Sequence, residues 1–250
     1  MNISIAFSGG GARCVAQLGY MEVLFDLGIK PAALSGSSGG SIVAAFLSIG
    51  YDPHEVLRII KNFPLNKIKF NLLHGSIFTL ENVIEELQRL GLENFQQCHI
   101  PLSVCLTGYD DGKSYYVQHG DLARAVLASS ALLPIFAPME FEGKLYIDGG
   151  FSDNLPVTPL PKDHFRLALN VNPLRFDFKR TFWGNFKRAG YIMLNTNIKH
   201  SIQKCDKYVE FDECAKFDIL DRKHFDEIYT IGKKLAMKEM EEWEQICCND

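Results

Sequence analysis

The sequence predicts an α/β fold, a three-layer α/β/α sandwich with a mainly parallel central sheet. Three observations predict it. Short apolar runs alternate with stretches of helical periodicity, glycine-rich turns follow several of these runs, and the order strand, glycine turn, helix occurs twice near the start of the chain. No internal repeat, low-complexity tract or linker is visible, so we expect a single domain over residues 1–250.

The individual elements follow from apolar periodicity and from the turn residues that bound each run. We expect strands at residues 2–8, 32–35, 100–107, 114–117, 144–147, 165–171 and 208–211. We expect helices at residues 15–25, 42–49, 54–62, 80–90, 122–131 and 225–246. Residues 63–78 are apolar without a clear period, so we expect an irregular segment there.

Composition excludes several classes of function. A net charge of −4 and an isoelectric point near 6.0 predict no nucleic-acid partner. No signal-peptide pattern opens the chain, and no run of about 18 apolar residues predicts a membrane span. The seven cysteines form no CxxC pair, which argues against a disulfide framework or zinc site and favours a cytoplasmic location. Nothing in the sequence indicates an oligomeric state.

The most specific motif is Gly36-Ser37-Ser38-Gly39-Gly40, which matches G-x-S-x-G between an expected strand and an expected helix. Such a turn lifts a serine hydroxyl out of the backbone, and small neighbours allow this strained geometry. The following helix presents free N–H groups where negative charge develops during ester cleavage. We therefore expect Ser38 to be a nucleophile, with Gly36, Gly39 and Gly40 shaping its turn.

A second turn, Gly9-Gly10-Gly11, also joins a strand to a helix. Glycines let backbone N–H groups approach a substrate closely, as an oxyanion hole requires. A dinucleotide-binding loop would need G-x-G-x-x-G, but Cys14 stands in place of the third glycine. A Walker A loop would need a following G-K-[ST], which is missing as well.

A serine nucleophile needs a base, and Asp148 has a suitable position in Asp148-Gly149-Gly150, directly after an expected strand. None of the seven histidines lies between a strand end and a glycine turn, so each is better interpreted as a surface or hydrogen-bonded residue. In open α/β sheets, chemistry collects at the carboxyl ends of the strands. We expect the three glycine turns to converge there.

Taken together, these motifs resemble those of the patatin-like phospholipases, a family of serine–aspartate lipid acyl hydrolases. The triglycine followed by Arg13, the elbow around Ser38 and the aspartate turn with Gly149 match three of the family's motifs. The segment 128–138 resembles the one that precedes the aspartate, and Asn154 and Pro156 also match. The similarity covers residues 3–160, with the strands and helices of residues 161–250 less diagnostic. Cys14 departs from the family pattern, where glycine is common.

The resemblance implies a patatin-like fold and a catalytic dyad without histidine. Ser38 would attack an ester carbonyl while Asp148 takes its proton. The N–H groups of Gly10 and Gly11, together with Gly9, would hold the oxyanion. Arg13 would either support the glycine turn or meet a phosphate, and neither a metal nor another cofactor is implied.

Two segments could give access to lipid. Residues 172–191 hold five basic side chains and five phenylalanine and tryptophan side chains, with a single aspartate. This segment could contact an anionic membrane surface, or it could form a helix with its aromatic side chains in the core. The apolar stretch 63–78 could form a lid or an acyl-chain wall, or be plain structure.

The expected function is hydrolysis of the acyl ester of a phospholipid or lysophospholipid through an acyl-enzyme. Acyl transfer to an alcohol or lysolipid would need the same dyad, so the sequence leaves it open. The alternative from another class is a non-catalytic lipid-binding module that keeps the fold.

Overall fold

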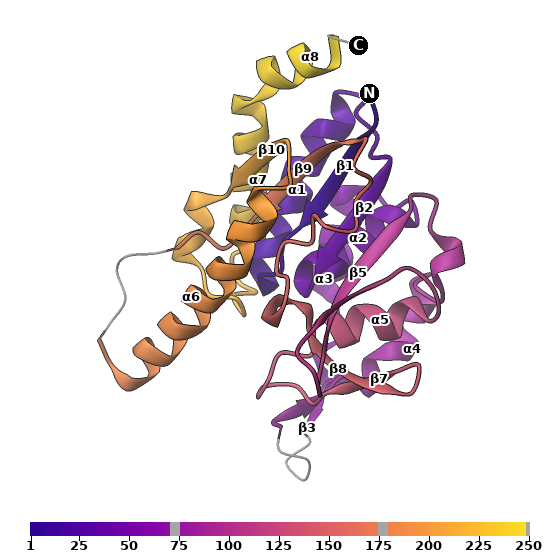
Figure 1. Cartoon of the computed structure of the whole chain (residues 1–250), viewed down its shortest axis with the longest axis vertical. Helices are drawn as coiled ribbons and strands as arrows, with labels where there is room; N and C mark the ends of the chain where they lie inside the picture. The colour runs from indigo at the N-terminus through magenta and orange to yellow at the C-terminus, as the bar shows by residue number, and fades with distance from the viewer. Residues whose placement is uncertain (71–75, 175–179, 249–250) are drawn as a thin grey trace.

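The computed structural model of the chain describes residues 1–70, 76–174 and 180–248, without the side chains of Leu65, Phe70, Trp183, Phe186, Lys187, Cys247 and Cys248. Its centre is a mixed β-sheet (Figure 1). Along the sheet the strands run β10 (Lys207–Glu210), β9 (Phe165–Asn170), β1 (Ile3–Phe7), β2 (Ala33–Ser37), β5 (Leu102–Gly108), β8 (Lys144–Asp148) and β7 (Met139–Phe141), and β6 (Ser114–Val117) also pairs with β5. β3 (Lys69–Phe70) and β4 (Phe78–Thr79) form a separate small pair.

The five strands from β10 to β5 are parallel, whereas β6, β7 and β8 pair antiparallel to their neighbours. Helices cover both faces, as the α/β expectation requires. They are α1 (Val15–Asp26), α2 (Gly39–Ser48), α3 (Pro53–Asn62), α4 (Ile84–Arg89), α5 (Leu122–Ser129), α6 (Phe182–Ile202), α7 (Phe225–Lys238) and α8 (Met240–Cys248). In Figure 1, α6 lies in front of the sheet and α1, α2 and α3 lie behind it.

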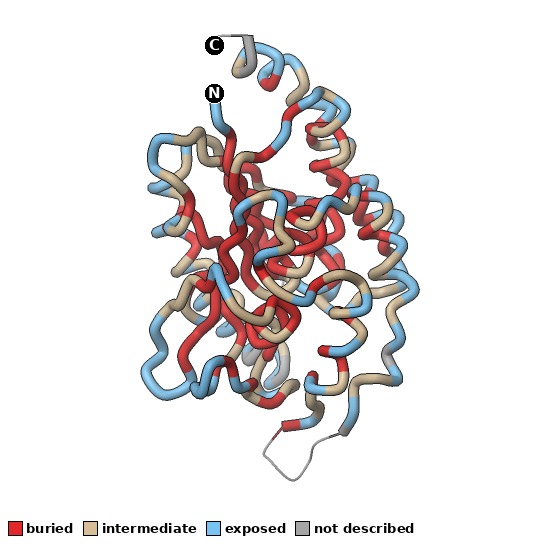
Figure 2. Tube along the Cα trace, turned by 90° about the vertical axis from the view of Figure 1, so that its right-hand side faces the viewer, coloured by how far each residue is buried: buried red, intermediate tan, exposed pale blue. Residues whose placement is uncertain are grey.

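Alternating side chains of β1 define the two cores. Ile5 and Phe7 belong to the large apolar core that α1, α2, α5 and α7 cover. Ala6 points to the opposite face, where a smaller core contains Ile198 of α6. Figure 2 shows the buried residues gathered along the central strands, with exposed residues on the outer helices and loops. No helix in the described part of the chain combines the length and apolar character needed to cross a bilayer.

The contact between α1 and α7 depends on two glycines. A Cβ at Gly232 would collide with the backbone oxygen of Ala16, and one at Gly19 would collide with that of Tyr229. The two helices therefore touch backbone to backbone, and each glycine makes room for the other helix. This contact anchors the C-terminal part of the chain against the first helix.

Two strands share one edge of β5 and approach each other from opposite directions. β6 pairs with residues 104–107 of β5, β2 with residues 102–105 and β8 with residues 106–108. Because a strand has only two edges, β2 and β8 must both lie opposite β6. β2 ends at Ser37 beside Cys105, and β8 ends at Asp148 beside Leu106, so these two strand ends meet head to head.

The structure corrects several expected details. The strand before Asp148 is antiparallel to β5, a direction that the sequence did not indicate, although Asp148 lies at the carboxyl end of its own strand. Helix α2 begins at Gly39, earlier than expected, and the C-terminal pattern forms two helices that separate at Glu239. β7 was not expected, because its three residues are too few to show a period in the sequence.

Candidate active site

The meeting strand ends bring Ser38 and Asp148 into direct contact. Ser38 follows β2 and Asp148 closes β8, so both lie at the level of Leu106 along β5. The Ser38 Oγ donates to Asp148 Oδ2 over 2.6 Å, although 110 positions separate the two residues in the sequence. A short hydrogen bond from a hydroxyl to a carboxylate is the arrangement needed for proton transfer during nucleophilic attack.

The turn that carries Ser38 has the strained backbone expected of a nucleophile elbow. Ser38 has φ 50° and ψ −130°, a conformation that L-residues rarely adopt. Gly36 and Gly40 make it possible, because a Cβ at either position would collide with neighbouring backbone atoms. The N–H of Ser38 donates to Ser129 Oγ (2.8 Å), which fixes the turn against α5.

Ser129 also completes the edge of β5. The carbonyl oxygen of Cys105 lies where β2 has ended, and the Ser129 hydroxyl donates to it over 2.7 Å. One side chain thus accepts from the elbow and donates to the central strand. Ser129 lies in the family-like segment 128–138, but the sequence shows no role for it because its two partners are far away along the chain.

Asp148 is only 4% exposed, and two groups hold its carboxylate. Oδ1 accepts from the Gly150 N–H (2.8 Å), while Oδ2 accepts from Ser38. Burial raises the pKa of Asp148 to about 6, although both hydrogen bonds favour the ionised form. Gly149 permits this close packing, since a Cβ there would meet the Cys105 carbonyl oxygen. An aspartate with such a pKa can accept a proton near neutral pH.

The glycine turn lies beside the elbow, as expected. An added Cβ at Gly9 would come within 2.8 Å of Ser38 Cβ, and one at Gly39 within 3.1 Å of the Gly11 nitrogen. Within the described part of the chain, the N–H groups of Gly10 and Gly11 have no hydrogen-bond acceptor. Gly11 has φ +57°, and a Cβ there would collide with the carbonyl oxygen of Ile219.

Gly9 differs from the expectation. Its N–H donates to the carbonyl oxygen of Asn154 over 3.0 Å, so this group is already engaged. The carbonyl oxygen of Gly9 accepts from the side-chain amide of Asn172. Gly9 therefore anchors the turn, and Gly10 and Gly11 are the residues with N–H groups left for an oxyanion.

Arg13 ties the glycine turn to the C-terminal part of the chain. Its side chain is buried, and Nε and one terminal nitrogen donate to the carbonyl oxygen of Phe217 at 2.9 and 2.6 Å. The guanidinium carbon lies 5.2 Å from the ring centroid of Tyr191 on α6. These contacts favour the supporting role over the alternative contact with a phosphate.

The departure at Cys14 fits the structure. Cys14 is buried, and its thiol donates to the carbonyl oxygen of Ser8 over 3.4 Å. An added Cβ at Gly39 would lie only 2.9 Å from the sulfur, so that glycine provides the space which the cysteine occupies. Burial raises the pKa of Cys14, which keeps the thiol neutral.

No histidine in the described ranges hydrogen-bonds to Ser38, and His74 lies outside the described residues. The two clearest histidine contacts lie elsewhere, between His164 and Ser4 and between His224 and Asp221. Among residues 1–70, 76–174 and 180–248, no three His, Cys, Asp or Glu side chains are grouped so that they could hold a metal ion.

The segment 172–191 is described only in part. Asn172 is buried against the glycine turn, residues 175–179 lie outside the described residues, and α6 begins at Phe182. The side chains of Trp183, Phe186 and Lys187 also lie outside the described part, so Phe182 is the one phenylalanine or tryptophan of this segment whose side chain is described. That side chain is 77% exposed.

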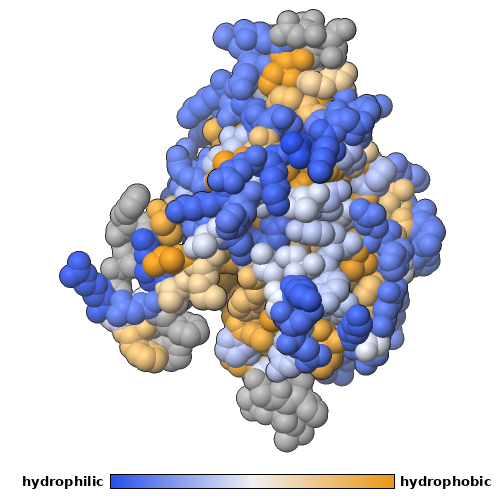
Figure 3. Space-filling model, viewed as in Figure 1, coloured by the Kyte–Doolittle hydropathy of each residue, from blue (hydrophilic) through white to orange (hydrophobic). Residues whose placement is uncertain are grey.

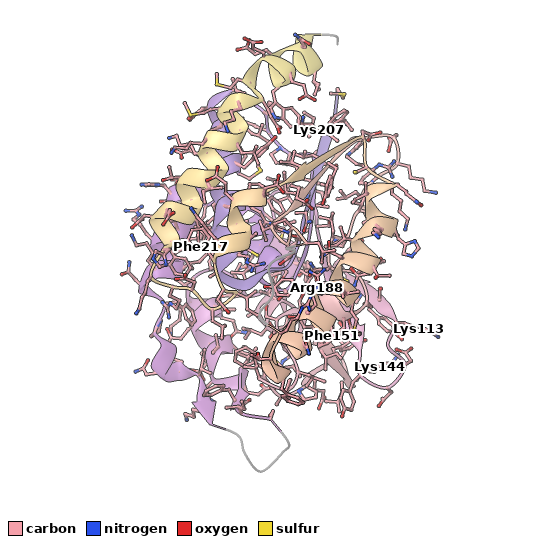
Figure 4. The ribbon with its side chains drawn as sticks, turned by 90° about the vertical axis from the view of Figure 1, so that its left-hand side faces the viewer. Lys113, Lys144, Phe151, Arg188, Lys207 and Phe217 are labelled. Atoms are coloured by element: carbon pink, nitrogen blue, oxygen red, sulfur yellow. The ribbon has the colours of Figure 1, made fainter. Side chains whose placement is uncertain are left out.

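Further along α6, Ile192 and Met193 are 47% and 63% exposed. Figure 3 shows apolar residues on α6 and on the surface facing it, with a hollow between this helix and the body of the molecule. Phe151, exposed directly after the aspartate turn, belongs to η6 (Gly149–Phe151), which contacts α6. In Figure 4, Phe151 and Arg188 of α6 are labelled close together.

Residues 63–78 are only partly described, since 71–75 lie outside the described residues. What is described contains a short 3-10 helix, η2 (Leu65–Lys67), β3 and the start of β4, so the segment is less irregular than expected. The Phe78 N–H donates to the carbonyl oxygen of Ile135, which attaches its far end to the loop after α5.

Residues 5–161 match the model of a family described as patatin-like phospholipase. The chain belongs to this family. The match contains the glycine turn, the elbow and the aspartate turn, and it agrees with the resemblance found in the sequence.

This patatin-like chain is similar to an uncharacterized NTE family protein of Mycobacterium tuberculosis, with 28% identity over 174 residues that cover 68% of this chain and 48% of that protein. It is also similar to lysophospholipase NTE1 of Saccharomyces cerevisiae, with 24% identity over 92% of this chain and 16% of the yeast protein. The chain thus spans about half or less of these curated relatives.

Among solved structures, the chain is similar to VipD from Legionella pneumophila, with a TM-score of 0.58 and 13% identity over 96% of this chain and 66% of that one. At this identity the likeness concerns the fold alone. It agrees with the mixed sheet covered by helices on both faces.

Proposed function

We propose that this patatin-like protein hydrolyses carboxylic esters of phospholipids or lysophospholipids through an acyl-enzyme on Ser38, with Asp148 as the base. The observation that carries the proposal is the 2.6 Å contact between Ser38 Oγ and Asp148 Oδ2 at a strained strand-to-helix turn. The N–H groups of Gly10 and Gly11, which have no acceptor among the described residues, also support it. So does the family, whose described activity is that of a phospholipase.

In the first step, Ser38 Oγ bonds to the ester carbonyl carbon while its proton moves to Asp148 Oδ2. The carbonyl oxygen becomes an oxyanion, which the N–H groups of Gly10 and Gly11 stabilise; one such donor is typically worth about 3–4 kcal/mol in the transition state. The bond to the leaving alcohol then breaks, and Asp148 returns the proton to that alcohol. The acyl group remains on Ser38.

In the second step, water replaces the alcohol. Asp148, again ionised, takes a proton from the water while the water oxygen attacks the acyl carbon. The oxyanion forms at the same N–H groups, the bond to Ser38 Oγ breaks, and the proton passes from Asp148 to that oxygen. The fatty acid leaves and the dyad is restored.

We also propose that the enzyme takes its substrate from a lipid surface. Phe182, Ile192 and Met193 give α6 exposed apolar side chains. Residues 178–205 contain six lysines and arginines and no acidic residue, in a chain of net charge −4. Exposed apolar side chains can insert into the surface of a bilayer, and the surrounding lysines and arginines attract its anionic headgroups. The contact thus extends beyond residue 191, the end of the segment expected from the sequence.

A fluorophosphonate probe tests the dyad directly, because it forms a covalent bond only with an activated serine. Labelling of the wild type at Ser38, and none of Ser38→Ala, is the expected result. Ser41→Ala is a matched control, since Ser41 lies in the same turn and donates only to the Ser38 carbonyl oxygen. An unlabelled wild type would remove hydrolysis and leave the non-catalytic lipid-binding module.

Acyl transfer uses the same acyl-enzyme, with an alcohol or lysolipid in place of water. The assay that separates the two reactions is product analysis of a phospholipid digest with and without an added lysolipid. Free fatty acid as the main product in both digests is expected. A shift to newly acylated lipid at the expense of fatty acid would make the protein a transacylase.

A further inference from the structure

The segment from Gly150 to Asn154 connects the two halves of the active site. At one end, the Gly150 N–H donates to Asp148 Oδ1 over 2.8 Å. At the other end, the carbonyl oxygen of Asn154 accepts from the Gly9 N–H over 3.0 Å. Any displacement of this segment therefore moves both the carboxylate and the glycine turn.

One side chain of α6 holds both ends of the segment. Asn197 Nδ2 donates to the carbonyl oxygen of Gly150 over 2.9 Å, and Asn197 Oδ1 accepts from the Asn154 N–H over 3.2 Å. The amide uses its donor and its acceptor at once, so its orientation is fixed by its partners. An aliphatic side chain of the same shape would make neither bond.

The part of α6 that carries Asn197 is itself well anchored. The next residue, Ile198, is buried in the smaller core, and Ser201 donates to Asp153 Oδ1 over 3.1 Å. Thr196, in contrast, is exposed, and its hydroxyl donates to the Ile192 carbonyl oxygen within the helix. The inward face of α6 thus holds the segment firmly, while the outward face is free of it.

We propose that Asn197 is a positioning residue of the active site, which sets the Asp148 carboxylate and the glycine turn relative to Ser38. The inference rests on the proposed function and deepens it. Asn197 touches no reacting atom; it acts through Gly150 on the base and through Asn154 on Gly9. The family model ends at residue 161, so this contribution comes from the part of the chain beyond that match.

The effect on rate follows from geometry. A displacement of a reacting group by about 1 Å can cost about 100-fold in rate. Without Asn197, the Gly150 N–H is held less firmly against the carboxylate, and a hydrogen bond that favours ionised Asp148 weakens. The pKa of Asp148 therefore rises, and the acid limb of kcat/KM moves to higher pH.

The experiment compares Asn197→Leu, Asn197→Asp and the control Thr196→Ala with the wild type. Leucine matches the shape of asparagine without its hydrogen bonds; aspartate keeps the acceptor for Asn154 but loses the donor to Gly150. The readouts are the rate of fluorophosphonate labelling, kcat/KM for a water-soluble short-chain ester from pH 5 to 9, and the melting temperature.

For both Asn197 variants we expect labelling rates and kcat/KM that are about 10- to 100-fold lower, with the acid limb of the kcat/KM profile at higher pH. Thr196→Ala should keep the wild-type values. If Asn197→Leu does not fold, Asn197→Asp carries the test. A folded Asn197 variant with wild-type kcat/KM and an unchanged pH profile would overturn the proposal. An inactive, unlabelled wild type would instead mean that the proposed function itself is wrong.

Discussion

Replacing Asp148 by asparagine should abolish hydrolysis and at the same time stabilise the folded protein at neutral pH. The substitution is isosteric, and asparagine can make both hydrogen bonds of the native side chain. Its Oδ1 accepts from Gly150, and its Nδ2 donates to Ser38. What changes is the charge, which wild-type Asp148 must carry while buried.

The size of the effect comes from the pKa of Asp148, which burial raises from 3.8 to about 6. Each pH unit between the folded and unfolded pKa corresponds to about 1.4 kcal/mol, so ionised Asp148 costs the folded state about 3 kcal/mol. For a chain of this length, 3 kcal/mol corresponds to about 6–12 °C in melting temperature. The neutral asparagine side chain removes this cost.

The sign depends on pH. A carboxyl group with a raised folded pKa takes up protons on folding, so its unfavourable contribution is absent below pH 3.8 and complete above about pH 6. The gain from Asp148→Asn should therefore grow between these values, reaching roughly half its maximum near pH 5. Urea unfolding of both proteins at pH 5, 6, 7 and 8 measures it. Equal stability throughout, or a variant that is less stable at pH 8, would refute the reasoning.

Four further outcomes are expected. Wild-type kcat/KM for a soluble ester should fall about tenfold per pH unit well below pH 6, the pKa of Asp148, and a flat profile there would exclude this base. Ser129→Ala should lower the rate of fluorophosphonate labelling about tenfold and the free energy of unfolding by about 1–3 kcal/mol. The substitution leaves the Cys105 carbonyl oxygen and the Ser38 N–H without their partner. Labelling rates and urea unfolding measure the two effects. Gly232→Ala should destabilise the protein by at least about 2 kcal/mol, because the added methyl group collides with α1. Gly190→Ala on α6 has open space around it and should stabilise the protein by about 0.5–1 kcal/mol. Thermal unfolding measures both effects. Met193→Ser should weaken sedimentation with anionic vesicles and leave hydrolysis of a soluble ester unchanged, so unaltered sedimentation would exclude α6 as the lipid contact.

The local parts of the fold and site could be predicted from the sequence because their signals are local. Gly9 to Gly11, the elbow and the aspartate turn each carry their geometry in adjacent residues, and the alternation of strands and helices gives the α/β class. The contact between Ser38 and Asp148 could be anticipated from the joint presence of these turns. Its geometric basis could not be anticipated, because the sequence does not show that β8 runs antiparallel to β5.

The remaining residues act through partners that no local pattern reveals. Ser129 links the elbow to a strand carbonyl that becomes free only where two strands stop, and this depends on the register. Asn172 and Asn197 are single polar residues beyond the family match, with nothing beside them that marks a role. The engagement of the Gly9 N–H by Asn154 likewise depends on a contact across the sheet, so the sequence could not separate Gly9 from Gly10 and Gly11.

The head-to-head strands determine when Ser38 and Asp148 can first meet during synthesis. A nascent chain that has left the ribosome as far as residue 108 contains the serine turn, the glycine turn and the strand beside them, but it has no carboxylate to activate the hydroxyl. Forty further residues must leave the ribosome before Asp148 can meet the serine, and α6 follows later still. Under the proposed mechanism, Ser38 therefore stays without its base until both strands have been made and paired with β5.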